Sequence, residues 1–181
     1  ILAVMFAFLP AGTASAAESD PVCVVGGECY TSIQAAINAA PEGGVINVVA
    51  GTYNEALSIT KPLTLTGAGK DVTTIDGTGL TASTLFSGTG VTSGVLNISG
   101  FTFKDDPTAN ALMTYPVSFS GCTAPASINF SNNNIVGAGS IDYDWGLLAQ
   151  NSSCSIVINN NTFDNIGGNS IMLERATGPV E

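Results

Sequence analysis

The chain repeats itself at a period of about 30 residues, and this repeat limits its possible folds more than any other feature. In each copy two apolar residues alternate with polar ones, and a Gly or Asn follows. The copies begin at Leu63, Leu96, Ile128 and Ile156. A second apolar series with the same period begins at Leu57, Leu85, Val117, Leu147 and Ile171. Strands this short cannot bury themselves singly, so the copies must stack to form a core.

The stacked repeats predict an all-β protein, a parallel β-solenoid of about four to five coils. A β-sandwich also has many short strands, but it does not explain a turn residue that recurs in register. That residue defines a turn column, which consists of Gly67, Gly100, Asn132 and Asn160. We expect positive φ at these positions, since Gly adopts it freely and Asn tolerates it best. Stacked Asn side chains could also form a hydrogen-bonded ladder.

One helix is predicted ahead of the repeats. Thr31 is its expected N-cap, Gln34 would complete a capping box, and Pro41 ends it. Its apolar stripe comprises Ile33, Ala36, Ile37 and Ala40. Laid over the first coil, this helix would protect an otherwise unpaired sheet edge.

The N-terminal residues indicate export. Residues 1–16 have the apolar run and the Ala14-Ser15-Ala16 cleavage pattern of a secretory signal peptide, and we expect its true start to be missing. The apolar run is too short to span a bilayer, so no transmembrane helix is predicted. We expect a secreted or cell-surface protein with an N-terminal segment at 17–30. The β-helix domain would cover 31–181 and continue beyond Glu181.

Cysteine usage agrees with export. Four cysteines allow three pairings, and the spacing of zinc sites is absent. Cys23 and Cys29 could close a small loop in the N-terminal segment. Cys122 and Cys154 fall on the same loop of successive coils, and a coil spacing of about 4.8 Å suits a disulfide. We therefore favour a Cys122–Cys154 bond between coils, and the pairing of all four cysteines stays open.

Charge excludes several classes of function. The chain has 4 basic and 14 acidic residues, a net charge of −10, and no histidine. A Ser-His triad, a His-ligated zinc and an imidazole base are therefore excluded. The acidic balance argues against nucleic acid as a partner, because a phosphate backbone requires clustered Lys and Arg.

Several segments resemble the first coil of right-handed parallel β-helix proteins, the pectin-lyase-like superfamily. They are 32–37, 45–55, 63–69 and 74–77, and the Gly51-Thr-Tyr-Asn-Glu55 stretch is particularly similar to pectinesterases. The resemblance extends over about residues 31–175. It implies a right-handed β-helix, but secreted surface proteins, lyases, hydrolases and esterases share this pattern.

The catalytic motifs of those enzymes are absent from this chain. Pectinesterases carry Gln-Asp-Thr and Asp-Phe-Ile-Phe-Gly motifs, and neither occurs here. With the second apolar series facing inward, the expected outward residues are Phe86, Ser118, Leu148 and Met172. None of these is an acid or a base, and only Glu174 and Arg175 lie near that face. No catalytic residue and no metal ligand is therefore assigned.

One cluster could bind a ligand. Asp142, Tyr143, Asp144 and Trp145 offer two carboxylates and two aromatic rings directly before a strand. Such a group could bind a sugar by stacking and hydrogen bonds, or hold calcium. The alternative is a loop whose Trp145 packs against the solenoid.

The remaining acids are interpreted structurally. Asp105, Asp106 and Asp164 are expected to be solvated turn residues, Asp76 a turn acid before Gly77, and Glu55 a surface acid.

Two functions remain open. The first is a monomeric, non-catalytic extracellular scaffold that contacts polysaccharide or a cell-surface partner. It requires no cofactor, although calcium could bind. The second is the N-terminal part of a polysaccharide-active enzyme, resembling a pectate lyase, polygalacturonase or pectinesterase, with catalytic residues beyond Glu181.

Overall fold

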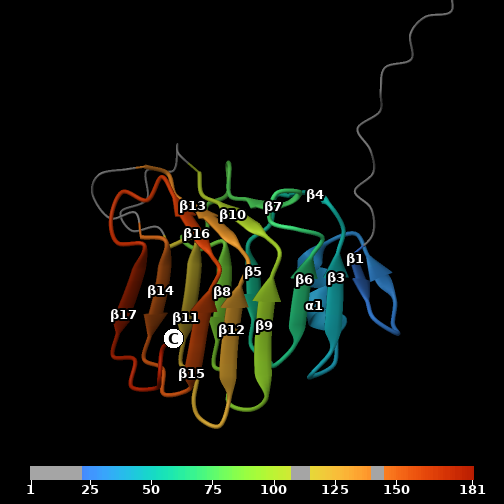
Figure 1. The fold of residues 1–181 in the computed structure, drawn as a ribbon. Helices are drawn as coiled ribbons and strands as arrows, with labels where there is room; N and C mark the ends of the chain where they lie inside the picture. Colours follow the sequence, from blue (N-terminus) through green and yellow to red (C-terminus); the bar gives the residue numbers. More distant parts are fainter. Residues whose placement is uncertain (1–21, 107–114, 140–144) are drawn as a thin grey trace, which may run out of the picture.

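The computed structural model describes residues 22–106, 115–139 and 145–181, and these form a parallel β-helix (Figure 1). Each coil contributes one strand to each of three sheets. Five coils are present among the described residues, since each sheet contains five parallel strands. The predicted signal peptide lies outside the described residues.

The three sheets take their strands from successive coils. Sheet A contains β3 Val45–Val48, β6 Thr64–Gly67, β9 Val95–Ser99, β12 Ser127–Ser131 and β15 Ser155–Asn159. Sheet B contains β4 Gly51–Tyr53, β7 Thr73–Asp76, β10 Thr102–Lys104, β13 Asn134–Val136 and β16 Thr162–Asp164. Sheet C contains β5 Leu57–Ile59, β8 Phe86–Thr89, β11 Val117–Ser120, β14 Leu147–Gln150 and β17 Ile171–Glu174. The two repeat series of the sequence correspond to sheets A and C.

Alternate residues of most strands in the first four coils point into one continuous core. Its centre is a contiguous group of aromatic rings from neighbouring coils, with centroids 5.5–5.9 Å apart. The rings belong to Phe86, Phe101, Phe103, Phe119 and Phe130, all fully buried. Edge-to-face and tilted contacts of this kind add to the stabilisation from buried area.

The register of β8 differs from the prediction by one residue. Phe86, rather than Leu85, pairs with Val117. Phe86 therefore faces inward and is fully buried, so its predicted outward orientation is wrong. Leu148 does lie on the outward side of its strand, but it is only 4% exposed. Ser118 and Met172 are partly exposed on that side.

The N-terminal end of sheet A is covered by an antiparallel hairpin. Strands β1 Val22–Val24 and β2 Cys29–Tyr30 pair with each other, and β1 pairs antiparallel with β3. Helix α1, Ile33–Ala39, lies against this end and contacts β1, β2, β3 and β5. The end is thus covered by the hairpin and the helix together, whereas the sequence had suggested the helix alone.

Helix α1 begins one residue later than expected. Its N-cap is Ser32, whose hydroxyl accepts a hydrogen bond from the Ala35 N–H, so the prediction of Thr31 is wrong. Glu55 accepts the Ile33 and Gln34 N–H groups at 2.9 and 3.0 Å. Gln34 bonds through its side chain to Asn38 and the Ser58 backbone rather than closing a capping box. Glu55 is therefore a partly exposed capping residue for a helix that begins 22 residues earlier in the chain, rather than an acid bonded only to solvent.

Replacing Glu55 with Gln is expected to lower the free energy of unfolding by about 1 kcal/mol, because an amide offers one acceptor oxygen where the carboxylate offers two. Urea unfolding followed by circular dichroism would measure this. Glu42→Gln, at an exposed acid that caps nothing, is the matched control. An equal loss in both variants would show that net charge, not capping, is responsible.

The turn column is in register along sheet A, and three of its four members have positive φ. The values are 82° at Gly100, 55° at Asn132 and 53° at Asn160. Gly67 does not have positive φ, so that expectation is wrong. It is required for space: a Cβ there would lie 2.3 Å from the Gly100 carbonyl oxygen.

Asparagine ladders form beside the turn column rather than within it. On sheet A, Asn129 donates to Asn97 at 2.8 Å, and Asn97 donates to Thr64. In the turns, Asn133 and Asn161 each donate to a backbone carbonyl of the preceding coil, and Asn161 also accepts the Asn133 N–H. These side chains satisfy backbone groups that the turns would otherwise leave unpaired.

The favoured bond between coils is present, and so is the small-loop disulfide. Cys23 bonds to Cys29 within the hairpin, and Cys122 bonds to Cys154 between successive coils, with Cα atoms 5.5 Å apart. The second bond is buried, since Cys122 and Cys154 are 0% and 1% exposed.

Candidate functional site

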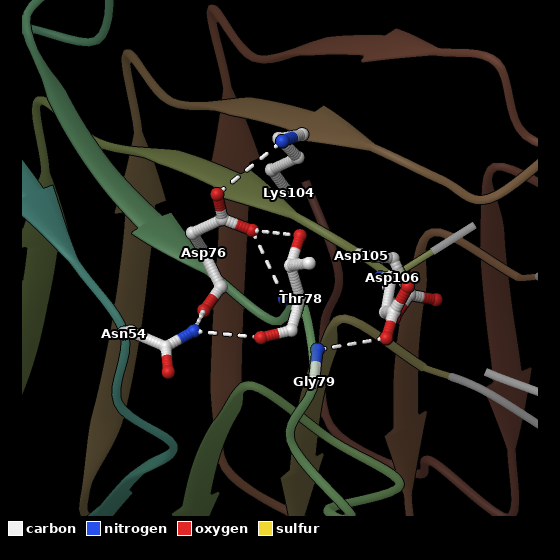
Figure 2. Close-up of polar contacts among 7 residues, drawn as sticks. All are labelled: Asn54, Asp76, Thr78, Gly79, Lys104, Asp105 and Asp106. Atoms are coloured by element: carbon white, nitrogen blue, oxygen red, sulfur yellow. Dashed lines mark hydrogen bonds and ion pairs between the residues drawn. The ribbon is translucent and has the colours of Figure 1, made fainter. Parts of the chain in front are cut away.

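A polar cluster lies where the strands of sheet B end (Figure 2). Asp76 and Lys104 are the last residues of β7 and β10, and they form an ion pair at 3.3 Å. The other carboxylate oxygen of Asp76 accepts the Thr78 N–H at 3.0 Å and its hydroxyl at 2.6 Å. Asn54 donates to the carbonyls of Asp76 and Thr78. The Asp76 carboxylate therefore fixes the turn that follows its own strand.

Asp105 and Asp106 are buried beside this turn, 7% and 5% exposed, so the prediction of solvated turn acids is wrong for both. Asp106 Oδ2 accepts the Gly79 N–H at 2.8 Å, which ties this turn to the previous coil. Asp105 Oδ1 accepts the Asp106 N–H. Asp164, at the equivalent end of β16, is exposed as expected. Burial of Asp105 and Asp106 follows from the backbone N–H groups that need acceptors there.

The surroundings of Asp76 alter its acidity. Partial burial raises the pKa of this carboxyl, but the hydrogen bonds from Thr78 and the hydrogen bond and charge of Lys104 outweigh it. The pKa of Asp76 is therefore lowered from its ordinary value. Because the folded pKa lies below the unfolded one, the stabilisation is fully present above the unfolded pKa and is lost as pH falls through the folded value.

We expect the wild type to lose stability on acidification below about pH 4 more steeply than Asp76→Asn, which has no carboxylate to protonate. Urea midpoints measured across the acid range would show the difference. Asp71→Asn, at an exposed acid, should follow the wild-type curve. Parallel curves for the wild type and Asp76→Asn would contradict the assigned role of Asp76.

The contacts of this cluster stabilise the turn after β7 and connect it to the next coil. The carboxylate oxygens of Asp76 and Asp106 accept hydrogen bonds from their own and the neighbouring coil. Among residues 22–106, 115–139 and 145–181, no group of three or more Cys, Asp or Glu could hold a metal ion. No helix in these ranges is long and apolar enough to cross a bilayer.

A pair of aromatic rings lies at the start of sheet C. Tyr115 and Trp145 each precede their strand by two residues, and the two strands, β11 and β14, are neighbours in the sheet. Their ring centroids are 5.1 Å apart, with an interplanar angle of 51°. Both side chains are partly exposed. This aromatic pair therefore places two partly exposed, tilted rings from successive coils side by side.

The electrostatic surroundings of the aromatic pair are acidic. Partial burial raises the pKa of the Tyr115 phenol, and the nearby Glu174 carboxylate raises it further. The hydroxyl is therefore protonated and able to donate a hydrogen bond at neutral pH.

The structure tests only part of the predicted binding cluster. Asp142, Tyr143 and Asp144 lie outside the described residues. Trp145 is described, and its ring contacts Tyr115, a residue that the sequence reasoning had not selected. The shared offset of Tyr115 and Trp145 from Val117 and Leu147 is the signal that could have identified the pair.

Three stacked parallel sheets with one strand per coil define the chain as a right-handed parallel β-helix. It belongs to the family described as "Protein of unknown function (DUF1565)", whose model matches residues 25–178.

Two solved structures are similar to this chain. One is a mutant pectin methylesterase in complex with a hexasaccharide, 20% identical, with a TM-score of 0.48; the match covers 74% of this chain and 46% of that one. The other is a pectin methylesterase with another hexasaccharide, 19% identical, with a TM-score of 0.42, covering 74% and 53%. The chain thus spans about half the length of these structures. No curated protein matches it.

Proposed function

We propose that this β-helix is a non-catalytic extracellular module that binds a polysaccharide on the aromatic pair. The observation that carries the proposal is the exposure of Tyr115 and Trp145 on successive coils, 5.1 Å apart. Aromatic faces stack on the apolar faces of sugar rings, and a phenol can hydrogen-bond their hydroxyls. Each residue lies two positions before a strand, and the pairing of β11 with β14 brings the two rings together before a ligand arrives.

Two further features support this proposal. The two disulfides are typical of proteins that function in an oxidising compartment outside the cytosol. The carboxylates that a hydrolase would need as acid and base accept hydrogen bonds from the chain itself at Asp76 and Asp106.

Calorimetric titration with a panel of hexasaccharides tests the proposal. Trp145→Ala should weaken binding at least about tenfold, which corresponds to about 1.4 kcal/mol. Val95→Ala, which truncates an exposed apolar residue on sheet A, is the matched control and should bind as the wild type does. Equal affinities of Trp145→Ala and the wild type for every bound hexasaccharide would refute the proposal.

The second candidate is a polysaccharide-active enzyme. The observation that favours it is the polar cluster at the end of sheet B, in which Asp76 pairs with Lys104 while Asp105 and Asp106 lie on the other side of Thr78, since carboxylates and amines serve as general acids and bases. Pectin turnover by the full-length protein, abolished in a stably folded Asp106→Asn variant, would favour the enzyme over the scaffold.

A further inference from the structure

The aromatic pair lies at the start of sheet C, and none of the outward residues of the five sheet C strands is basic. The outward residues of sheet C include one rank that begins with the hydroxyls of Ser58, Ser87 and Ser118 and continues with the apolar Leu148 and Met172. A second rank runs in register through Thr89, Ser120, Gln150 and Glu174. Only Glu174 in these two ranks is charged. Such a surface offers hydrogen bonds to sugar hydroxyls but no positive charge for a carboxylate.

The basic residues of the chain are occupied elsewhere or accompanied by an acid. Lys61 donates to the Asn38 and Ala40 carbonyls, Lys70 donates to Thr162, and Lys104 pairs with Asp76. Arg175 is exposed, but it directly follows Glu174. With a net charge of −10, the molecule repels a polyanion at long range as well.

The spacing of the two rings also indicates how a bound glycan would be oriented relative to the solenoid axis. Neighbouring strands of a sheet are about 4.8 Å apart, and the two ring centroids are separated by 5.1 Å. This distance is close to the advance per sugar of an extended β-1,4-linked glycan. A glycan that runs along the solenoid axis would therefore meet a new coil with each sugar.

We propose that the ligand of the aromatic pair is an uncharged, extended glycan aligned with the solenoid axis, and that acidic polysaccharides are excluded by charge. This inference rests on the proposed function, because it specifies the ligand class of the same site. The Glu174 carboxylate provides the local repulsion, and its influence already extends to the Tyr115 phenol.

Three hexasaccharides separate charge from shape in the test. Cellohexaose is neutral and hexagalacturonate is acidic. Fully methyl-esterified hexagalacturonate has the same sugar backbone as hexagalacturonate, but its carboxylates are neutral methyl esters. Trp145 is the only tryptophan, so its fluorescence reports directly on this site in the wild type. We expect cellohexaose to bind, because its linkages are β-1,4. Of the two α-1,4-linked hexamers, we expect hexagalacturonate to bind at least about tenfold more weakly than its methyl ester at low salt, with the gap in affinity narrowing as salt screens the repulsion.

Variants assign the effect to named residues. Glu174→Gln should narrow the affinity ratio between esterified and free hexagalacturonate. Tyr115→Ala, followed by Trp145 fluorescence, should weaken both neutral hexamers and serves as a second site variant in case Trp145→Ala does not fold.

The failure of this inference can be distinguished from the failure of the proposed function. Tighter binding of hexagalacturonate than of its methyl ester, with both lost in Trp145→Ala, would overturn the uncharged-ligand inference but leave polysaccharide binding intact. Hexagalacturonate affinity that depends on Arg175, tested with Arg175→Gln, would overturn the inference in the same way. No response to any hexamer by fluorescence or calorimetry would refute both.

Discussion

Replacing Gly100 with Ala is expected to lower the free energy of unfolding by about 3 kcal/mol, as measured by urea unfolding. A left-handed conformation costs an L-residue roughly 1–2 kcal/mol. Overpacking against fixed neighbours costs about 1–3 kcal/mol more. Both apply here, because Gly100 has a φ of 82° and an added Cβ would lie 2.5 Å from the Gly67 carbonyl oxygen.

Gly90→Ala is the matched control for this prediction. Gly90 has a similar φ of 68°, but no atom lies within 4 Å of the position its Cβ would take. The control should therefore lose only the conformational contribution, about 1 kcal/mol. Equal losses at Gly90 and Gly100 would show that the close approach of the two coils is not a constraint.

Removing the disulfide between coils with Cys122→Ala and Cys154→Ala should cost about 4 kcal/mol, because the bond closes a long loop in the unfolded chain. The sequence separation is 32 residues. Thermal unfolding of the double variant under oxidising conditions would show a correspondingly lower midpoint.

The second disulfide provides the comparison. Cys23 and Cys29 are separated by 6 residues, so the same entropic argument predicts a loss of only about 2 kcal/mol for Cys23→Ala with Cys29→Ala. A larger loss from the short loop than from the long one would show that loop entropy does not govern these bonds.

The sheets could be predicted because the repeat is regular, but some registers could not. Leu85 and Phe86 are both apolar, so periodicity does not decide which faces inward, and only pairing with Val117 decides it. Likewise Thr31 and Ser32 are both favourable N-cap residue types, with Ser somewhat preferred. In both cases adjacent residues satisfy the same local rule, and the choice depends on tertiary contacts.

The roles of the acids were harder to predict because their partners are distant in sequence. Glu55 meets the start of α1 across 22 residues, and Asp106 meets Gly79 across 27. Composition and turn propensity describe only local surroundings, so they assigned these residues to the surface. The aromatic pair was hard to predict for the same reason. Trp145 could be selected from the residues around it in sequence, but Tyr115 becomes its neighbour only when the coils stack.

The antiparallel hairpin at the start of sheet A affects how strands of another molecule could pair with this end of the solenoid. A strand edge in β-structure can recruit further strands from other molecules. Here the outermost strand is β2, which has two residues and is held by the Cys23–Cys29 bond, and its neighbour β1 runs against the direction of the coils (Figure 1). Because β2 has only two residues, this edge offers few backbone groups with which a strand of a second solenoid could pair. The hairpin thus replaces the longer edge that β3 would otherwise expose with a very short one, which disfavours end-to-end association of solenoids.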